Sequence, residues 1–200
     1  MIFGAGFDSR ALRFTQLNKG TRIFELDAPI TQQEKWKAYI SNKLPVPENL
    51  VFVPINFNKE RLAEKIAQAG FISGKKSLFM LEGITMYLSQ DTIESTFHFI
   101  AEVSGRGSFI VFDYIHAGVL RRENKYYGEE DIYKTVAKAG EEWTFALEEN
   151  EVERFLARYG FLQKDQSGTR KLENKYFRNS KGLIVGKING TNAIVTGIRS

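Results

Sequence analysis

The chain has 200 residues, of which 42% are apolar, and a formal net charge of +4; this suffices for one core, and we expect a single domain over residues 1–200. The sequence has no cysteine, which excludes disulfides and thiolate metal sites, and its two separate histidines form no metal cluster, so we expect no bound metal. Apolar runs stay below the roughly 18 residues of a membrane span, and the first residues lack a signal-peptide pattern, which favours a cytoplasmic protein with no membrane partner. Basic residues are mixed with acids along the chain, so nucleic-acid binding is not indicated.

A glycine-rich turn follows the first apolar residues. Met1-Ile2-Phe3 leads into Gly4-Ala5-Gly6-Phe7-Asp8-Ser9-Arg10. Between a buried strand and a helix, such a turn lets the backbone approach a ligand and points helix N-terminal amides at it. The pattern predicts a nucleotide-type cofactor site at the start of the chain, with a purely structural tight turn as the alternative.

Strand-like and helical patterns then alternate along the chain. The expected strands are residues 21–27, 50–55, 77–82 and 107–113, and the expected helices are residues 9–16, 58–69, 89–104 and 149–159. This order is typical of repeated βαβ units. It predicts an α/β protein with a doubly wound, mostly parallel sheet.

Two later segments depart from this rhythm. Residues 114–145 are long for a simple connection and predict one or two helices inserted after the fifth strand; such insertions are often lids or substrate walls. Near the C-terminus, residues 182–187 and 192–198 flank Asn189-Gly190, a dipeptide that favours hairpin turns. We therefore expect an antiparallel edge on the parallel sheet.

Acids close the second and fourth expected strands. In a doubly wound sheet, ligands bind at the carboxyl ends of the strands, where the strand order reverses. Glu25 and Asp27 point to the same face of their strand, and Asp27 is nearer the tip; it either holds ribose hydroxyls or caps the next helix. Glu82 ends the fourth strand between apolar residues. A buried carboxylate is costly without a partner, so we predict a functional role for Glu82.

The third strand ends in Asn56-Phe57, a polar side chain and an aromatic ring that suit the edge of an adenine. Asn56 equally fits a helix cap around Asn58. In the glycine turn there are two alternatives for Arg10. It forms an ion pair with Asp8 within the loop, or it binds an anionic group of the cofactor. Asp8 also fits the N-cap of the first helix.

Three further side chains are candidates for the substrate side. Tyr114 and His116 follow the fifth strand beside Asp113, and a plain structural role is the alternative for both. Tyr87 follows Glu82 closely in the chain. The predicted pocket wall is therefore Tyr87 together with the insertion after Asp113.

Six segments match a known family in order and spacing. They are GAGFDSR, FELDAP, PINF, FMLEGITMYL, FIVFDYIH and EEWTFALEENEVERFLARYGF. Through them the chain resembles the leucine carboxyl methyltransferase family of S-adenosylmethionine-dependent methyltransferases over nearly its whole length. The GAGxDxR turn combined with the E-G-x-x-M-Y-L strand end is far more specific than the glycine pattern alone.

The resemblance implies a seven-stranded Rossmann-like methyltransferase sheet with an antiparallel C-terminal strand and with S-adenosyl-L-methionine over its carboxyl edge. It places Gly4 against the cofactor, Asp27 at the ribose, Asn56-Phe57 at the adenine and Glu82 near the methionine moiety. The family has Asp-Leu where this chain has Asn56-Phe57, which keeps an acceptor but removes a charge. The predicted cofactor-binding residues are Gly4, Ala5, Gly6, Asp8, Arg10, Asp27, Asn56, Phe57 and Glu82, and the predicted substrate-side residues are Tyr87, Tyr114 and His116.

The implied activity is methyl transfer to an oxygen of a carboxylate or hydroxyl, on a small molecule or a protein C-terminus. A carboxylate is already ionised at neutral pH, whereas a hydroxyl needs a base, for which Tyr114 and His116 are candidates. Family members carry an N-terminal helical lid segment, so we expect this chain to be a truncated form or a fragment.

Two other functions stay open at this point. One is an NAD-binding oxidoreductase, against which Ser9 stands where the dinucleotide fingerprint asks for Gly or Ala. The other is a non-catalytic cofactor-binding or interaction module.

Overall fold

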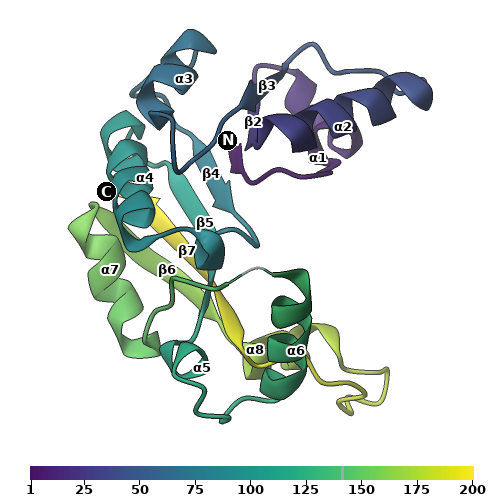
Figure 1. The fold of residues 1–200 in the computed structure, drawn as a ribbon, viewed down its shortest axis with the longest axis vertical. Helices are drawn as coiled ribbons and strands as arrows, with labels where there is room; N and C mark the ends of the chain where they lie inside the picture. The colour runs from purple at the N-terminus through teal and green to yellow at the C-terminus, as the bar shows by residue number, and fades with distance from the viewer. Residues whose placement is uncertain (141) are drawn as a thin grey trace.

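A computed structural model describes residues 1–140 and 142–200; Glu141, within the predicted insertion, lies outside the described residues. The strands are β1 (Ile2–Phe3), β2 (Ile23–Asp27), β3 (Leu50–Pro54), β4 (Leu78–Leu81), β5 (Phe109–Ile115), β6 (Phe161–Ser167) and β7 (Asn192–Arg199). The α-helices are α1 (Arg10–Arg13), α2 (Pro29–Ser41), α3 (Leu62–Gln68), α4 (Gln90–Val103), α5 (Ala117–Leu120), α6 (Glu129–Ala139), α7 (Val152–Arg158) and α8 (Thr169–Tyr176), as drawn in Figure 1. Within the described ranges, none of the helices has the length and apolar character needed to cross a membrane.

The seven strands form one sheet in the order β3-β2-β1-β4-β5-β7-β6. Strands β1 to β5 pair in parallel, whereas β7 runs antiparallel to both β5 and β6. This confirms the predicted doubly wound, mostly parallel seven-stranded α/β sheet with an antiparallel C-terminal strand. The strand order reverses between β1 and β4, so the carboxyl ends of these two strands lie next to each other.

Helices cover the sheet from two sides. The main apolar cluster joins Phe3 and the neighbouring strands to α3, α4 and α7, with Phe97 of α4 fully buried in it. A smaller cluster joins Ile2 to Ala11 of α1 and Tyr39 of α2. Successive residues of a strand point to opposite faces, so Ile2 and Phe3 place these clusters on opposite faces of the sheet. Figure 1 shows α4 and α7 to the left of the sheet, with α1 and α2 away from them on the right.

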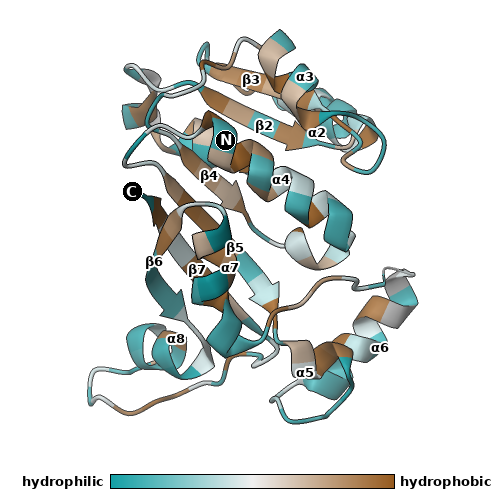
Figure 2. Cartoon of the chain, turned by 90° about the vertical axis from the view of Figure 1, so that its left-hand side faces the viewer, coloured by the Kyte–Doolittle hydropathy of each residue, from teal (hydrophilic) through white to brown (hydrophobic). Residues whose placement is uncertain are grey.

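The β4, β5, β7 and β6 part of the sheet has two unlike faces. The face toward α4 and α7 is buried, as the neighbouring residues Leu81 and Phe112 illustrate. On the other face, Leu78, Leu162 and Ile194 are exposed. Figure 2 shows that apolar residues gather in the strands, while α8 is mostly hydrophilic. The principal core therefore lies between the sheet and α3, α4 and α7.

The predicted C-terminal hairpin is wrong. The partner of β7 on its outer side is β6, and residues 182–187 form no strand in the described structure beyond an isolated pairing of Arg178 with Ile184. The Asn189 side chain accepts the N–H of Thr191 at 2.9 Å instead of opening a tight hairpin. The edge of the sheet is β6, whose polar sequence after Phe161 hid it from the periodicity analysis.

Two helix boundaries also differ from expectation. The helix expected from Asn58 begins at Leu62, with Arg61 as its N-cap, so the predicted Asn cap is wrong. The first helix is a single turn, Arg10–Arg13, with Ser9 rather than Asp8 at its N-cap. Ser89, in contrast, accepts the Thr92 N–H at the start of α4, where the helix was expected.

In the described part of the insertion after β5 lie two helices, α5 and α6, in agreement with the prediction of one or two. The buried Glu129 carboxylate holds the loop between them, because it accepts the N–H groups of Asn124, Lys125 and Tyr126 at 3.0, 3.0 and 3.1 Å. This turns a long connection into an ordered wall beside the carboxyl end of β5.

The packing around Phe97 yields a stability prediction. Its ring lies 5.3, 4.7 and 5.3 Å from the ring centroids of Phe112, Phe155 and Tyr159. Replacing Phe97 by Ala removes this buried ring and should lower the free energy of unfolding by about 3–5 kcal/mol. Urea denaturation measures it, with the exposed Leu183→Ala as the matched control; equal stability of the two variants would contradict this packing.

Candidate functional site

The candidate site lies at the carboxyl ends of the parallel strands, around the reversal between β1 and β4. Phe3 is in register with both Leu26 of β2 and Leu81 of β4. The turn after β1, the end of β2 and the end of β4 are therefore neighbours. This edge brings together the glycine turn, Asp27 and Glu82, which the sequence places far apart.

Asp27 ties the glycine turn to the end of β2. One carboxylate oxygen accepts the Gly6 N–H at 2.6 Å, and the other accepts the Ala28 N–H at 2.6 Å. The buried Ala5 adds a bond from its N–H to Leu26 O at 3.0 Å. Asp27, which the sequence analysis predicts as a ligand-binding residue, thus fixes the conformation of the turn. Each of its carboxylate oxygens keeps a second lone pair for a ligand.

The two glycines of the turn have different surroundings. Both have positive φ values, 62° for Gly4 and 45° for Gly6, which glycine adopts without a steric penalty. A Cβ on Gly4 would lie 2.8 Å from Cδ1 of Ile84, whereas a Cβ on Gly6 would meet no atom within 4 Å. Gly4 is needed for close packing on the turn after β4, and the free space beside the loop lies at Gly6.

Arg10 connects the turn to the end of β4. Its guanidinium pairs with Asp8 at 3.3 Å and also with Glu82, and it lies 3.3 Å from the sulfur of Met80. Asp8 accepts the backbone N–H of Arg10 at 2.6 Å as well. The ion pair within the loop is therefore present and extends to β4. Glu82 is 50% exposed, so the expectation that its carboxylate is buried is wrong; the sheet edge leaves it open to solvent.

Glu25, which shares a face with Asp27, is unavailable to a ligand. It is completely buried and forms an ion pair of 2.5 Å with the buried Lys35 of α2, while Gln32 donates to its main-chain oxygen. Burial raises the pKa of Glu25 against the opposing effect of Lys35. Of the two acids of β2, Asp27 is the one at the open edge.

Asn56 and Phe57 lie beside Asp27, since the N–H of Ile55 donates to Asp27 O at 2.8 Å. The exposed Asn56 uses its side-chain oxygen locally, to accept the Asn58 N–H at 3.1 Å, and its own N–H donates to Glu60 at 2.8 Å. Phe57 packs near the end of β1, with its ring 6.2 Å from that of Phe3. The aromatic ring joins the edge, whereas the Asn56 side chain shapes the turn before α3.

The three predicted substrate-side residues have different environments. Tyr87 is 39% exposed in the short 3₁₀ helix Thr85–Tyr87. Tyr114 is fully buried and its hydroxyl accepts from Gln166 at 3.0 Å; burial raises its pKa. His116 is buried and stacks on Tyr126 at 4.7 Å, and burial lowers its pKa. Tyr114 and His116 therefore belong to the packed interior, and Tyr87 alone of the three is open.

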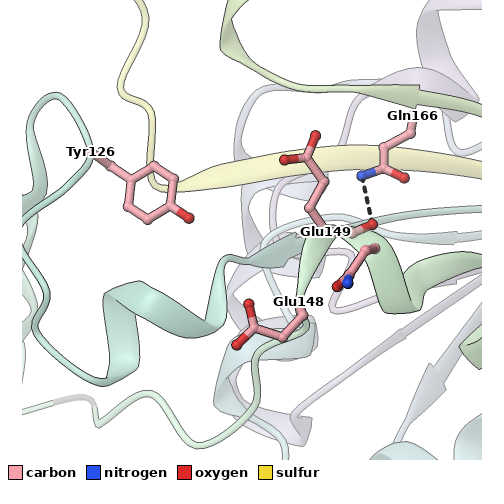
Figure 3. A pocket seen from close by; sticks show the side chains of 5 residues that line it. Tyr126, Glu148, Glu149 and Gln166 are labelled. Atoms are coloured by element: carbon pink, nitrogen blue, oxygen red, sulfur yellow. Dashed lines mark hydrogen bonds between the residues drawn. The ribbon is translucent and has the colours of Figure 1, made fainter.

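A polar hollow of about 550 Å³ lies above these buried rings. Figure 3 shows Tyr126, Glu148, Glu149 and Gln166 around it, and Asn150 completes the lining. Gln166 comes from the end of β6, and the two glutamates precede α7. The sequence analysis did not single out these residues as a site, because they come from three separate segments of the chain and share no spacing pattern.

Asp113 is a further residue of the edge that was passed over as a neighbour of Tyr114. Its carboxylate accepts the N–H of Gly83, directly after Glu82, at 2.8 Å. Burial raises the pKa of Asp113, and the Glu82 carboxylate adds to this shift, while the Gly83 N–H opposes it. Asp113 is the last residue of the strand expected at 107–113, and that position was the signal that could have identified it, although β5 continues to Ile115.

Comparisons with known proteins agree with this architecture. The family model of leucine carboxyl methyltransferase matches residues 1–101. A relative from Bacillus subtilis (strain 168), named "Putative S-adenosyl-L-methionine-dependent methyltransferase YktD", is 28% identical over 181 residues, which are 90% of this chain and 59% of YktD. A relative of the same description from Streptomyces coelicolor, SCO7813, is 29% identical over 61% of this chain and 42% of its own length.

Solved structures share the fold at low identity. The magnesium protoporphyrin IX methyltransferase of Synechocystis PCC 6803 with bound SAH has a TM-score of 0.57 at 12% identity, over 100% of this chain and 73% of that chain. An O-methyltransferase family protein from Burkholderia thailandensis has a TM-score of 0.60 at 11% identity, over 100% of this chain and 50% of that one.

The sheet is thus of the Rossmann-like type found in methyltransferases, with its strand order reversing between β1 and β4. The chain belongs to the leucine carboxyl methyltransferase family. It spans about three fifths of the length of YktD and about two fifths of that of SCO7813.

The buried His116 gives a pH prediction. Because its pKa is lowered in the folded state, the unfolded chain takes up the proton first as the pH falls, so stability is lost from about pH 6.5 downward. Glu148 and Glu149 oppose this shift but do not cancel it. His116→Gln should flatten the decrease in unfolding free energy between pH 7 and 5, measured by urea denaturation. The exposed His98→Gln is the control and should keep the wild-type slope; a wild-type slope in His116→Gln would refute the assignment.

Proposed function

We propose that this chain binds S-adenosyl-L-methionine at the edge between β1 and β4 and transfers its methyl group to an oxygen of a carboxylate or hydroxyl. The acceptor is a small molecule or a protein C-terminus. Support comes from family membership, from the descriptions of the relatives and from the folds of neighbours solved with the methyl donor or its product. The observation that carries the proposal is the free space at Gly6 beside the Asp27 carboxylate.

The donor set fits a nucleoside with an amino-acid tail. Asp27 would accept hydrogen bonds from the ribose hydroxyls through its remaining lone pairs. The backbone of Gly4, Ala5 and Gly6 would approach the ligand closely. The bound sulfonium supplies an activated methyl group, and the protein contributes alignment and exclusion of water.

The remaining residues hold the ends of the ligand in this proposal. Phe57 packs along the adenine, and Asn56 offers a side-chain amide at its edge. Glu82 lies toward the methionine moiety, where its pairing with Arg10 fixes the carboxylate, and Asp8 in turn orients Arg10. Arg10 is thus assigned an indirect part in binding, through Glu82, which differs from a direct contact with an anionic group.

We assign the substrate side to Tyr87 and to the insertion 114–145, within a single domain of residues 1–200. The support is the ordered wall of α5 and α6 and the open hollow beside Tyr126. Tyr114 and His116 contact the lining of this hollow from beneath, Tyr114 through its bond to Gln166 and His116 through its stacking on Tyr126.

Asp27→Ala tests the cofactor site. Loss of a charged acceptor should weaken binding of S-adenosylhomocysteine by about 1–3 kcal/mol, or roughly 5- to 150-fold in Kd. Isothermal titration calorimetry measures the change, with Asp91→Ala, an exposed acid of α4, as the control. Wild-type protein that binds NAD and not S-adenosylhomocysteine would favour the oxidoreductase, and binding of neither ligand would favour an interaction module.

Gly6→Ala tests the free space directly. The added methyl group clashes with no protein atom but projects into the space assigned to the ligand, so affinity for S-adenosylhomocysteine should fall at least tenfold. The backbone strain of a positive φ costs about 1 kcal/mol or more. Gly182→Ala is the matched control, because Gly182 also has a positive φ and open surroundings; it should lose similar stability and no affinity. Equal affinities of the two variants would refute the site.

A further inference from the structure

Two carboxylates lie on neighbouring segments of the chain, just past the last residue pair of β4 and β5. Leu81 is in register with Phe112, so Glu82 and Asp113 follow at equivalent positions on neighbouring strands. Asp113 accepts the Gly83 N–H at 2.8 Å, and its main-chain oxygen accepts the hydroxyl of the buried Thr85. Asp113 is therefore fixed to the same turn that carries Glu82.

The side chain of Asp113 points away from the principal core. Its neighbours Phe112 and Tyr114 are fully buried in the cluster beneath α4 and α7. Alternation along the strand directs Asp113 to the opposite face, where it is partly buried. The carboxylate therefore lies at the rim of the edge assigned to the cofactor.

The charges around Asp113 favour a role in proton transfer. Burial and the neighbouring Glu82 raise its pKa, while the Gly83 N–H and the Asn192 side chain oppose the shift. The guanidinium of Arg10 pairs with Glu82 and Asp8. Arg10 thus offsets the charge of Glu82, whereas the hydrogen-bond partner of the Asp113 carboxylate is a neutral backbone amide. The Asp113 carboxylate repels an anionic acceptor but accepts a hydrogen bond from a neutral hydroxyl.

We propose that Asp113 is a catalytic carboxylate that faces the transferred methyl group and accepts the proton of a hydroxyl acceptor. This rests on the proposed function. The hydroxyl oxygen forms the bond to the methyl carbon, the carbon–sulfur bond breaks with its electron pair left on sulfur, and the hydroxyl proton goes to Asp113. The step leaves a methyl ether, a neutral thioether and a protonated carboxyl group.

Asp113 fits this role better than the two bases considered from the sequence. The Tyr114 hydroxyl is buried and bonded to Gln166, and burial raises its pKa, which disfavours the phenolate. His116 is buried beneath Tyr126. Asp113, in contrast, is only partly buried, and one of its carboxylate oxygens accepts the Gly83 N–H.

The methyl donor and its product provide a test that does not need the acceptor. S-adenosylmethionine carries a positive charge on sulfur, and S-adenosylhomocysteine does not. A carboxylate close to that sulfur stabilises the charged ligand, so Asp113→Asn should weaken S-adenosylmethionine binding by about tenfold and change S-adenosylhomocysteine binding less than twofold. Asn keeps an oxygen for the Gly83 N–H, which isolates the loss of charge.

Calorimetric titration of both ligands from pH 4 to 8 measures the effect. In the wild type, the affinity for S-adenosylmethionine relative to S-adenosylhomocysteine should rise with pH as the Asp113 carboxyl group ionises. This rise should be absent in Asp113→Asn. Asp165→Asn, on β6 of the same sheet, is the control and should match the wild type. Equal losses for both ligands, or no loss, would overturn the role of Asp113. A wild type that binds neither ligand would overturn the proposed function instead.

Discussion

The contact on which the site depends is the pair of hydrogen bonds between Asp27 and the backbone at Gly6 and Ala28. Strand β1 has two residues, too few to fix the direction of the turn that follows. The bond from the Gly6 N–H to the carboxylate joins this turn to β2, while Arg10 joins it to β4 through Glu82. The Asp27 carboxylate thereby fixes the conformation of the turn. It can still accept further hydrogen bonds, because each of its oxygens has more than one lone pair.

Burial assigns different roles to acids of similar sequence context. Glu25 and Asp27 are two residues apart on one strand, yet Glu25 is enclosed with Lys35 beneath α2, and Asp27 lies at the edge. A buried ion pair costs desolvation and is retained where both partners are held in place, as they are here by α2 and β2. Glu82 and Asp113 form a second contrast: Glu82 is half-exposed and neutralised by Arg10, whereas Asp113 is partly covered and bonded to a backbone amide.

Much of the site follows from sequence because parallel strands bring their carboxyl ends to one edge. Gly4, Asp27 and Glu82 could be selected as strand-end residues, and the family motifs pointed to the same positions. Phe57 lies where its position after β3 predicts. Asn56 could be placed at that edge, but the local turn that takes its side-chain oxygen could not be foreseen. Asp113 was passed over since a single acid in an apolar strand has no spacing pattern of its own.

The sequence by itself determined the alternation of strands and helices, the doubly wound sheet and the family, because apolar periodicity and glycine-bounded turns are local properties of the chain. The tertiary structure alone decided that β6, a largely polar strand, pairs with β7, and that residues 182–187 do not. It also decided that Arg10 reaches Glu82 and that Tyr114 and His116 are buried. These outcomes depend on contacts between separate segments of the chain, two of them more than 50 positions apart, Arg10 with Glu82 and Tyr114 with Gln166, and no local pattern encodes them.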